Sequence, residues 1–91
     1  MDPAVTRNEA QSRFETTVDG ALCVLEYHLH DGVLAIDHVR VPPAVEGHGI
    51  AAALTKAALE SARHERWRVV PACAYAAAYI ERHPGYRDLV A

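Results

Sequence analysis

The chain has 91 residues, of which 51% are hydrophobic and 23% are charged, a composition typical of one small globular domain. Its net charge of −3 excludes the basic surface of a general nucleic-acid binder, so we expect no nucleic-acid partner. No apolar run reaches the roughly 20 residues of a membrane span, and the first residues lack the features of a signal peptide. We therefore expect residues 1–91 to form a single cytoplasmic domain, without membrane contact, that is a monomer or a small homo-oligomer.

The two cysteines and six histidines show no metal-ligand spacing. Disulfides are rare inside cells, so Cys23 and Cys73 are expected to be free thiols. Cys23 falls within an apolar strand and is expected to be a small buried side chain. The histidines are scattered along the chain, and we predict no metal site.

The first half of the chain predicts a β-sheet. Residues 1–10 are polar and are expected to be ordered only in part. Apolar patterns predict strands at 12–18, 21–29 and 33–41, separated by Asp-Gly pairs at 19–20 and 31–32 that favour tight turns. Two prolines at 42–43 end the third strand. Three antiparallel strands result, and the core face of the second carries Ala21, Cys23, Leu25, Tyr27 and Leu29.

The second half predicts helices around one further strand. Residues 47–64 have a helical period, with an apolar stripe that includes Ile50 and Leu54. A fourth strand follows at 67–71, and the right-handed crossover rule makes it parallel to the third strand. Residues 72–81 read as a second helix, followed by a last turn over 86–90. The predicted class is therefore α/β, in the broad α+β sense.

The stretch from residue 39 to 51 joins the third strand to the first helix through the two prolines and a Gly-x-Gly pair. A helix N-terminus presents backbone N–H groups without internal partners, together with a partial positive charge. Gly47 and Gly49 lack the Cβ atoms that would hold an anion away. The pattern therefore predicts an anion site, although a Gly-x-Gly pair alone is a weak signal.

Several spaced motifs resemble a known family over nearly the whole chain. They are Arg-Phe-Glu at 13–15, the strand, prolines and Gly-x-Gly of 39–51, Val-Val-Pro-Ala-Cys-Ala-Tyr at 69–75, and Tyr-Ile-Glu-Arg-His-Pro-Gly-Tyr at 79–86. Together they resemble the small, one-domain members of the GNAT acyl-CoA N-acetyltransferase superfamily. The resemblance implies a compact GNAT-like fold and acetyl-CoA as the co-substrate.

The resemblance also implies a coenzyme A site. The pantetheine arm would pair with backbone near Val39 and Val41, between the splayed third and fourth strands. Larger GNAT enzymes carry Gln or Arg where this chain has Ala44, a departure that leaves the amides to hold the phosphates. Glu46 has a second reading as a partner of the helix dipole. The pyrophosphate would lie against the backbone of Glu46, Gly47, His48, Gly49, Ile50 and Ala51.

Three residues are catalytic candidates by the same resemblance. Cys73 would face the acetyl group, at a helix start that favours a thiolate; the alternative is a packed thiol that lines the pocket. His38 would be the base or proton shuttle; the alternative is a half-buried histidine on the face of Leu34 and Ile36. Tyr79 would protonate the departing thiolate, with Tyr75 as its rival. Arg82 and His83 either reach the CoA phosphates or simply end a helix.

The predicted function is acetyl transfer from acetyl-CoA to an amine of unknown identity, either directly or through acetyl-Cys73. The alternative is a non-catalytic module that binds acyl-CoA or a partner protein. The second reading draws on the short chain, which lacks the N-terminal helices and final strands that shape an acceptor pocket in larger GNAT domains. A third reading is a purely structural domain whose glycines bind nothing.

Overall fold

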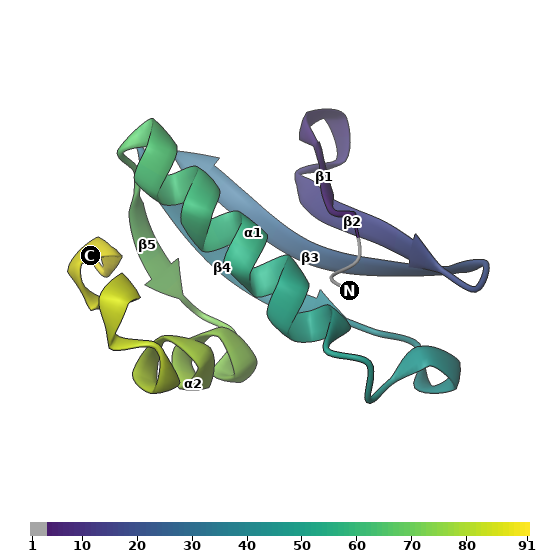
Figure 1. The fold of residues 1–91 in the computed structure, drawn as a ribbon. Coiled ribbons are helices and arrows are strands. Elements are labelled where there is room, and N and C mark those ends of the chain that lie inside the picture. Colours follow the sequence, from purple (N-terminus) through teal and green to yellow (C-terminus); the bar gives the residue numbers. More distant parts are fainter. Residues whose placement is uncertain (1–3) are drawn as a thin grey trace.

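A mixed five-stranded sheet, in the order β1-β2-β3-β4-β5, carries the fold of this computed structural model, which describes residues 4–91 (Figure 1). The first four strands pair antiparallel, and β5 pairs parallel with β4. The strands are β1 (Thr6–Asn8), β2 (Arg13–Val18), β3 (Ala21–His30), β4 (Val33–Arg40) and β5 (Arg68–Pro71).

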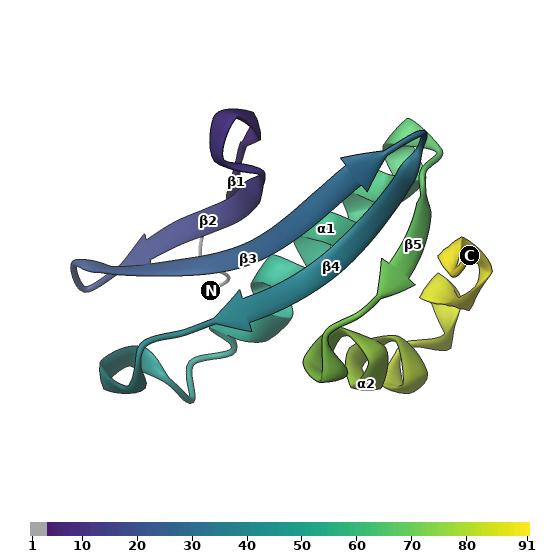
Figure 2. The same ribbon diagram turned by 180° about the vertical axis from the view of Figure 1, so that it is seen from behind.

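One face of the sheet is covered by the helix α1, and no helix of the described residues lies over the other face of β3 and β4 (Figures 1 and 2). The shorter helix α2 lies beyond the end of β5 and contacts α1, β4 and β5. The helices are α1 (Ile50–Glu65) and α2 (Ala74–Arg82), with short 3-10 helices η1 (Glu9–Gln11), η2 (Pro43–Val45) and η3 (Pro84–Leu89).

The structure confirms the predicted class, the antiparallel hairpins and the parallel crossover strand. The pairs Asp19-Gly20 and Asp31-Gly32 form the two hairpin turns, with φ of 49° and 77° in the first and 49° and 74° in the second. Such left-handed pairs match the twist of the flanking strands, and Asp and Gly tolerate them. The turn residues therefore set the register of the hairpins.

Three expectations about the elements need correction. Residues 6–11 form β1 and η1, which add a fifth strand to the predicted sheet, while residues 1–3 lie outside the described part. Helix α1 begins at Ile50 and not at residue 47, because Gly47 and Gly49 adopt positive φ and form the preceding loop. Helix α2 begins at Ala74, with Cys73 at its N-cap position.

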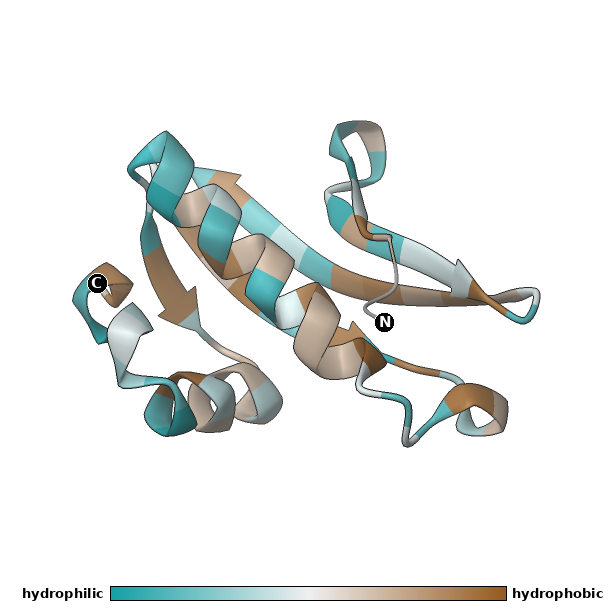
Figure 3. Cartoon of the chain, in the orientation of Figure 1, coloured by the Kyte–Doolittle hydropathy of each residue, from teal (hydrophilic) through white to brown (hydrophobic). Residues whose placement is uncertain are grey.

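The core lies between the sheet and the inner face of α1. Cys23, Leu25 and Tyr27 are buried as predicted, but Leu29 is 37% exposed because β2 pairs with β3 only as far as Glu26. Figure 3 shows mixed hydrophobic and hydrophilic colour along β2 and β3, hydrophobic colour over much of β5 and the first turn of α1, and hydrophilic colour toward the far end of α1. Helix α1 contributes Ile50, Leu54, Ala58, Leu59 and Ala62, whose small alanines allow close approach to the sheet.

A β-bulge in β4 reverses the side-chain alternation of that strand. Tyr27 pairs with Ile36 and Glu26 pairs with His38, so Asp37 is an extra residue. Leu34 and Ile36 face the core before the bulge, and Val39 packs against the core after it. Asp37 and His38 therefore both point to the uncovered face. The half-buried position expected for His38, beside Leu34 and Ile36, is wrong, and its side chain is exposed.

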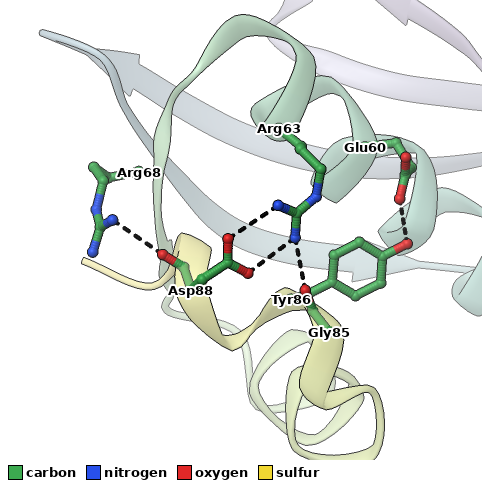
Figure 4. A network of polar contacts seen from close by, with 6 residues as sticks. All are labelled: Glu60, Arg63, Arg68, Gly85, Tyr86 and Asp88. Carbon is green, nitrogen blue, oxygen red and sulfur yellow. Dashed lines mark hydrogen bonds and ion pairs between the residues drawn. The ribbon is translucent and has the colours of Figure 1, made fainter.

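A polar network fixes the C-terminal segment to the far end of α1 (Figure 4). The Arg63 guanidinium donates to both carboxylate oxygens of Asp88 at 3.0 Å and to the Gly85 carbonyl at 2.7 Å. Arg68 donates to the Asp88 carbonyl at 3.0 Å, and the Tyr86 hydroxyl donates to the Glu60 carboxylate. These bonds hold η3 against α1 and the start of β5.

Candidate functional site

The strands β4 and β5 separate at one defined point. Their ladder ends where Ile36 pairs with Pro71, and the Cys73 N–H donates to the Ile36 carbonyl at 2.9 Å. The chain then turns into α2, whereas β4 continues to Arg40. Past Ile36, the edge of β4 that faced β5 has no strand beside it in the described part of the chain. That edge offers backbone N–H and C=O groups to an extended ligand.

The N-terminus of α1 lies next to this open edge and has no side-chain cap. Gly49 occupies the N-cap position, and the first helical bond runs from the Ala53 N–H to the Gly49 carbonyl at 3.0 Å. The amides of Ile50, Ala51 and Ala52 precede that bond and have no acceptor within the helix. They leave a positively polarised end that can bind an anion.

The two glycines of the loop have a conformational role that the sequence reading did not include. Gly47 has φ of +84° and Gly49 has φ of +71°, values that L-residues with side chains rarely adopt. A Cβ added at either position would meet no atom within 4 Å. The loop conformation itself therefore requires glycine, and the space beside each glycine is open for a ligand.

A cavity of about 370 Å³ joins the open edge of β4 to the N-terminus of α1. Seven of the eight residues predicted to bind the cofactor line it together, and His48 is the one outside its lining. Ala52 and Tyr75 complete the wall and were not among the predicted binding residues. The seven are Val39, Val41, Glu46, Gly47, Gly49, Ile50 and Ala51.

Among residues 4–91, no lysine or arginine side chain lines the cavity, and Glu46 is the one charged residue in its lining. An anion in the cavity would therefore be held by backbone amides and the helix dipole and not by a side-chain cation. The presence of Ala44 in place of Gln or Arg agrees with this, since Ala44 lies in η2 and its methyl side chain has no hydrogen-bond donor. The cavity can therefore accept an anionic group at its helix end and an extended chain along the open edge of β4.

A second cavity of about 360 Å³ adjoins the first, because Ala52 and Tyr75 line both. Tyr79, Arg82 and His83 lie in the lining of this second cavity. The Tyr79 ring is 9% exposed and stacks on His83 with their centroids 4.0 Å apart. Tyr75 is more exposed than Tyr79 and lines both cavities, because it lies on the first turn of α2.

Cys73 and His38 are placed on different sides of the sheet. Cys73 is partly buried, packs against the core and lies at the point where β4 and β5 separate. His38 follows the bulge and points to the uncovered face, where a cavity includes it together with Ala72. The structure thus brings Cys73 to the inner end of the open edge, and it does not place the His38 ring on the Cys73 side.

Two other features, a metal centre and a membrane-spanning helix, are considered for residues 4–91. No group of three or more His, Cys, Asp or Glu side chains is arranged to hold a metal ion in that range. Among the same residues, no helix has both the length and the apolar character needed to cross a membrane.

The family model of GCN5-related N-acetyltransferases matches residues 13–89, and the chain belongs to this family. A GCN5-like protein from Staphylococcus aureus, whose structure was determined by NMR, is similar with a TM-score of 0.75 and 25% identity. That match covers 99% of this chain and 89% of the other. A comparison with curated proteins gave no significant match.

Proposed function

We propose that the protein is an acetyl-CoA-dependent N-acetyltransferase that acts on an amine. The observation that carries the proposal is the cavity that joins the N-terminal amides of α1 to the open edge of β4. Membership of the GCN5-related family supports the choice of acetyl-CoA as donor.

In the proposed complex, the pyrophosphate lies against the amides around Gly47 and Gly49. The pantetheine arm runs back along β4, pairing with the backbone of Val39 and Val41. It ends where β4 and β5 separate, beside Cys73. From Val41 back to Ile36 an extended chain spans roughly 16 Å, so an extended arm along this edge reaches from the helix to the interior.

The reaction forms a C–N bond and breaks the acetyl C–S bond. A protonated acceptor amine gives up two protons in total, of which one ends on the CoA thiol and one passes to solvent. Holding both reactants at the point where the strands separate would supply much of the rate, since positioning alone is worth several orders of magnitude. Backbone amides near the thioester oxygen would stabilise the developing negative charge.

Cys73 is the proposed nucleophile of a two-step version. Its sulfur would attack the acetyl carbon and release the CoA thiolate, and the acceptor amine would then displace the Cys73 sulfur. The N-cap position of Cys73, at the start of a nine-residue helix, supports this role. In the one-step version the amine attacks the thioester directly and Cys73 only lines the pocket.

Proton transfer is assigned to two groups in the same proposal. Tyr79 and Tyr75 are the two candidates for donating a proton to the departing thiolate. Tyr75 is favoured because it lines the same cavity as Gly47 and Gly49. His38 is the proposed base, and its position on the uncovered face means that it would meet the acceptor from the side opposite α1.

The first test is the covalent adduct. After incubation with acetyl-CoA, intact mass spectrometry should show one added acetyl group on the wild-type chain, and Cys73→Ser should lose it. Cys23→Ala keeps Cys73 and serves as the matched cysteine control, which should retain the adduct. An equal adduct on Cys73→Ser would overturn the two-step version and leave direct transfer.

The second test separates an enzyme from a binding module. Calorimetry measures CoA binding, and a thiol reagent measures CoA release from acetyl-CoA across a panel of amines and peptides. Binding with amine-dependent release supports the transferase. Binding without release from any acceptor would contradict it in favour of an acyl-CoA-binding module, and absence of binding would remove both.

A further inference from the structure

The uncovered face of the sheet carries a cavity that the cofactor does not use. Its volume is about 460 Å³, enough for a small molecule. Figure 2 shows this face of β3 and β4 toward the viewer, with α1 behind the sheet. The lining comes from η1, the loop before β2, the strands β3 and β4, and the residue that follows β5. It consists of Gln11, Ser12, Glu26, Tyr27, His28, Asp37, His38 and Ala72.

The cavity lies directly behind the point where β4 and β5 separate. Asp37 and His38 follow Ile36, the last residue of β4 in the parallel ladder, and Ala72 precedes Cys73. The thioester end proposed above reaches the same point from the α1 side. A molecule in this cavity would therefore approach the acetyl carbon from the opposite side of the sheet.

The charges around the cavity leave one carboxylate for a ligand. In the described part of the chain, the lining contains Glu26 and Asp37 and no lysine or arginine. Arg40 donates to Glu26 at 2.7 and 3.1 Å, which neutralises that carboxylate and holds its pKa below the usual range. Arg13, the other nearby cation, pairs with Glu15 at 2.6 Å.

The Asp37 carboxylate is paired with a histidine, whereas the Glu26 carboxylate is paired with an arginine. Asp37 contacts the His28 ring, which is 86% exposed and carries a charge only when protonated. The bulge turns Asp37 and His38 to the same face, so a carboxylate and an imidazole stand side by side at the mouth of the cavity. The arrangement offers one anionic contact and one proton acceptor.

We propose that this cavity is the acceptor site and that it selects a small amine with a second positive charge, such as a diamine. This inference rests on the proposed acetyltransferase function. Asp37 binds the ammonium group that does not react, and His38 takes a proton from the amine that does. That amine then forms the C–N bond as the C–S bond of the thioester breaks, with the remaining proton going to the CoA thiol.

The kinetic test compares 1,4-diaminobutane with butylamine, which has the same carbon chain and one charge fewer. The diamine should have a KM lower by about fivefold, the range of a partly exposed ion pair. Asp37→Asn should remove that difference, while its CoA-induced thermal shift stays as in the wild type. Equal KM values for the two amines in the wild type would overturn the proposal.

The matched control is Asp31→Asn, which removes the same charge from the β3–β4 turn at a left-handed position that Asn tolerates. It should keep the preference for the diamine. An equal loss of preference in Asp31→Asn and Asp37→Asn would show a general charge effect and would overturn the assignment to this cavity.

A binding measurement distinguishes failure of this inference from failure of the transferase itself. If no amine releases CoA, the isotope-labelled chain is titrated with the two amines and followed by NMR. Shifts at Asp37 and His38 with 1,4-diaminobutane, and not with butylamine, would support the cavity independently of turnover. No difference between the two amines at these residues would overturn it.

Discussion

The two ends of α1 differ in how their polar groups are used. At the N-terminal end, Gly49 supplies no side-chain cap, and the first amides face a cavity. At the other end, Arg66 caps the helix in a left-handed conformation, with its N–H bonded to Ala62 and Arg63. Arg63 there binds Asp88 with two hydrogen bonds (Figure 4). One end of the helix is satisfied within the chain, and the other is available to a ligand.

The largest expected effect is at the N-terminal end. Gly49→Val should abolish the rise in Tm that CoA gives, because the added side chain projects into the open space where the pyrophosphate is proposed to lie. The positive φ should also cost about 1–2 kcal/mol of stability. Thermal melts with and without CoA measure both effects.

Gly20→Val is the matched control for Gly49→Val. Gly20 has φ of +77° and open space around it, but it lies in the β2–β3 turn away from the cavity. It should lose similar stability and keep the CoA response. Loss of the response in both variants would mean that strain, and not position, removes binding.

At the C-terminal end, Arg63→Met should lower Tm clearly while the shift caused by CoA is retained. The substitution keeps an apolar side chain of similar length at this position of α1 and removes the donors to Asp88 and Gly85. Hydrogen exchange should then become faster at the Ala91 N–H, which is bonded to the Val69 carbonyl at 2.9 Å. Unchanged exchange there would show that the network does not hold the segment.

Tyr86→Phe should have a smaller effect, about 1 kcal/mol, since it removes one hydrogen bond to a carboxylate. Burial, with the neighbouring Glu60 carboxylate, raises the pKa of Tyr86 to about 12. A raised pKa means that the neutral hydroxyl is favoured in the folded state. The stability due to Tyr86 should therefore be complete below pH 10 and decrease as the pH rises toward 12. Urea unfolding over this range should show a shallower loss in Tyr86→Phe.

The smallest effect is the acid dependence of Asp88. Its hydrogen bonds to Arg63 hold the pKa of Asp88 below the ordinary 3.8, which favours the charged form in the folded state. The contribution is present above the unfolded pKa and disappears as the pH falls through the lowered folded value. Asp88→Asn should flatten the acid limb of stability between pH 5 and 2, roughly the range of a single carboxylate. The lowered pKa of Glu26 also makes stability fall with pH on the acid side, and this contribution should remain in Asp88→Asn. An unchanged slope would contradict the prediction.

Much of the fold and of the cavity beside the glycine loop was predictable because local signals agreed with the final structure. The Asp-Gly pairs set two hairpins, and the apolar period set α1. The glycine loop came together in one cavity with Val39 of β4 and with Val41, which follows the strand. These features depend on turn chemistry and on the strand–helix crossover, both of which are written in short stretches of sequence.

The remaining features depend on contacts between distant residues. Strand β1 has three residues and no apolar alternation, and it forms only because β2 offers an edge to pair with. The bulge at Asp37 arises from the register of β4 against β3, which no pattern within β4 encodes. The sequence pattern therefore placed the His38 side chain on the wrong face of the sheet, with Leu34 and Ile36. The cavity on the uncovered face could not be predicted from the sequence.

The bulge also fixes which side chains the second half of β4 presents to each face of the sheet. If Asp37 paired regularly with β3, strict alternation would turn the ring of His38 toward α1 and the isopropyl group of Val39 toward solvent. Deletion of Asp37 would remove the bulge and leave both side chains on their present faces, because His38 would still pair with Glu26. The extra residue therefore lets Asp37 and His38 share the uncovered face while Val39 stays against the core.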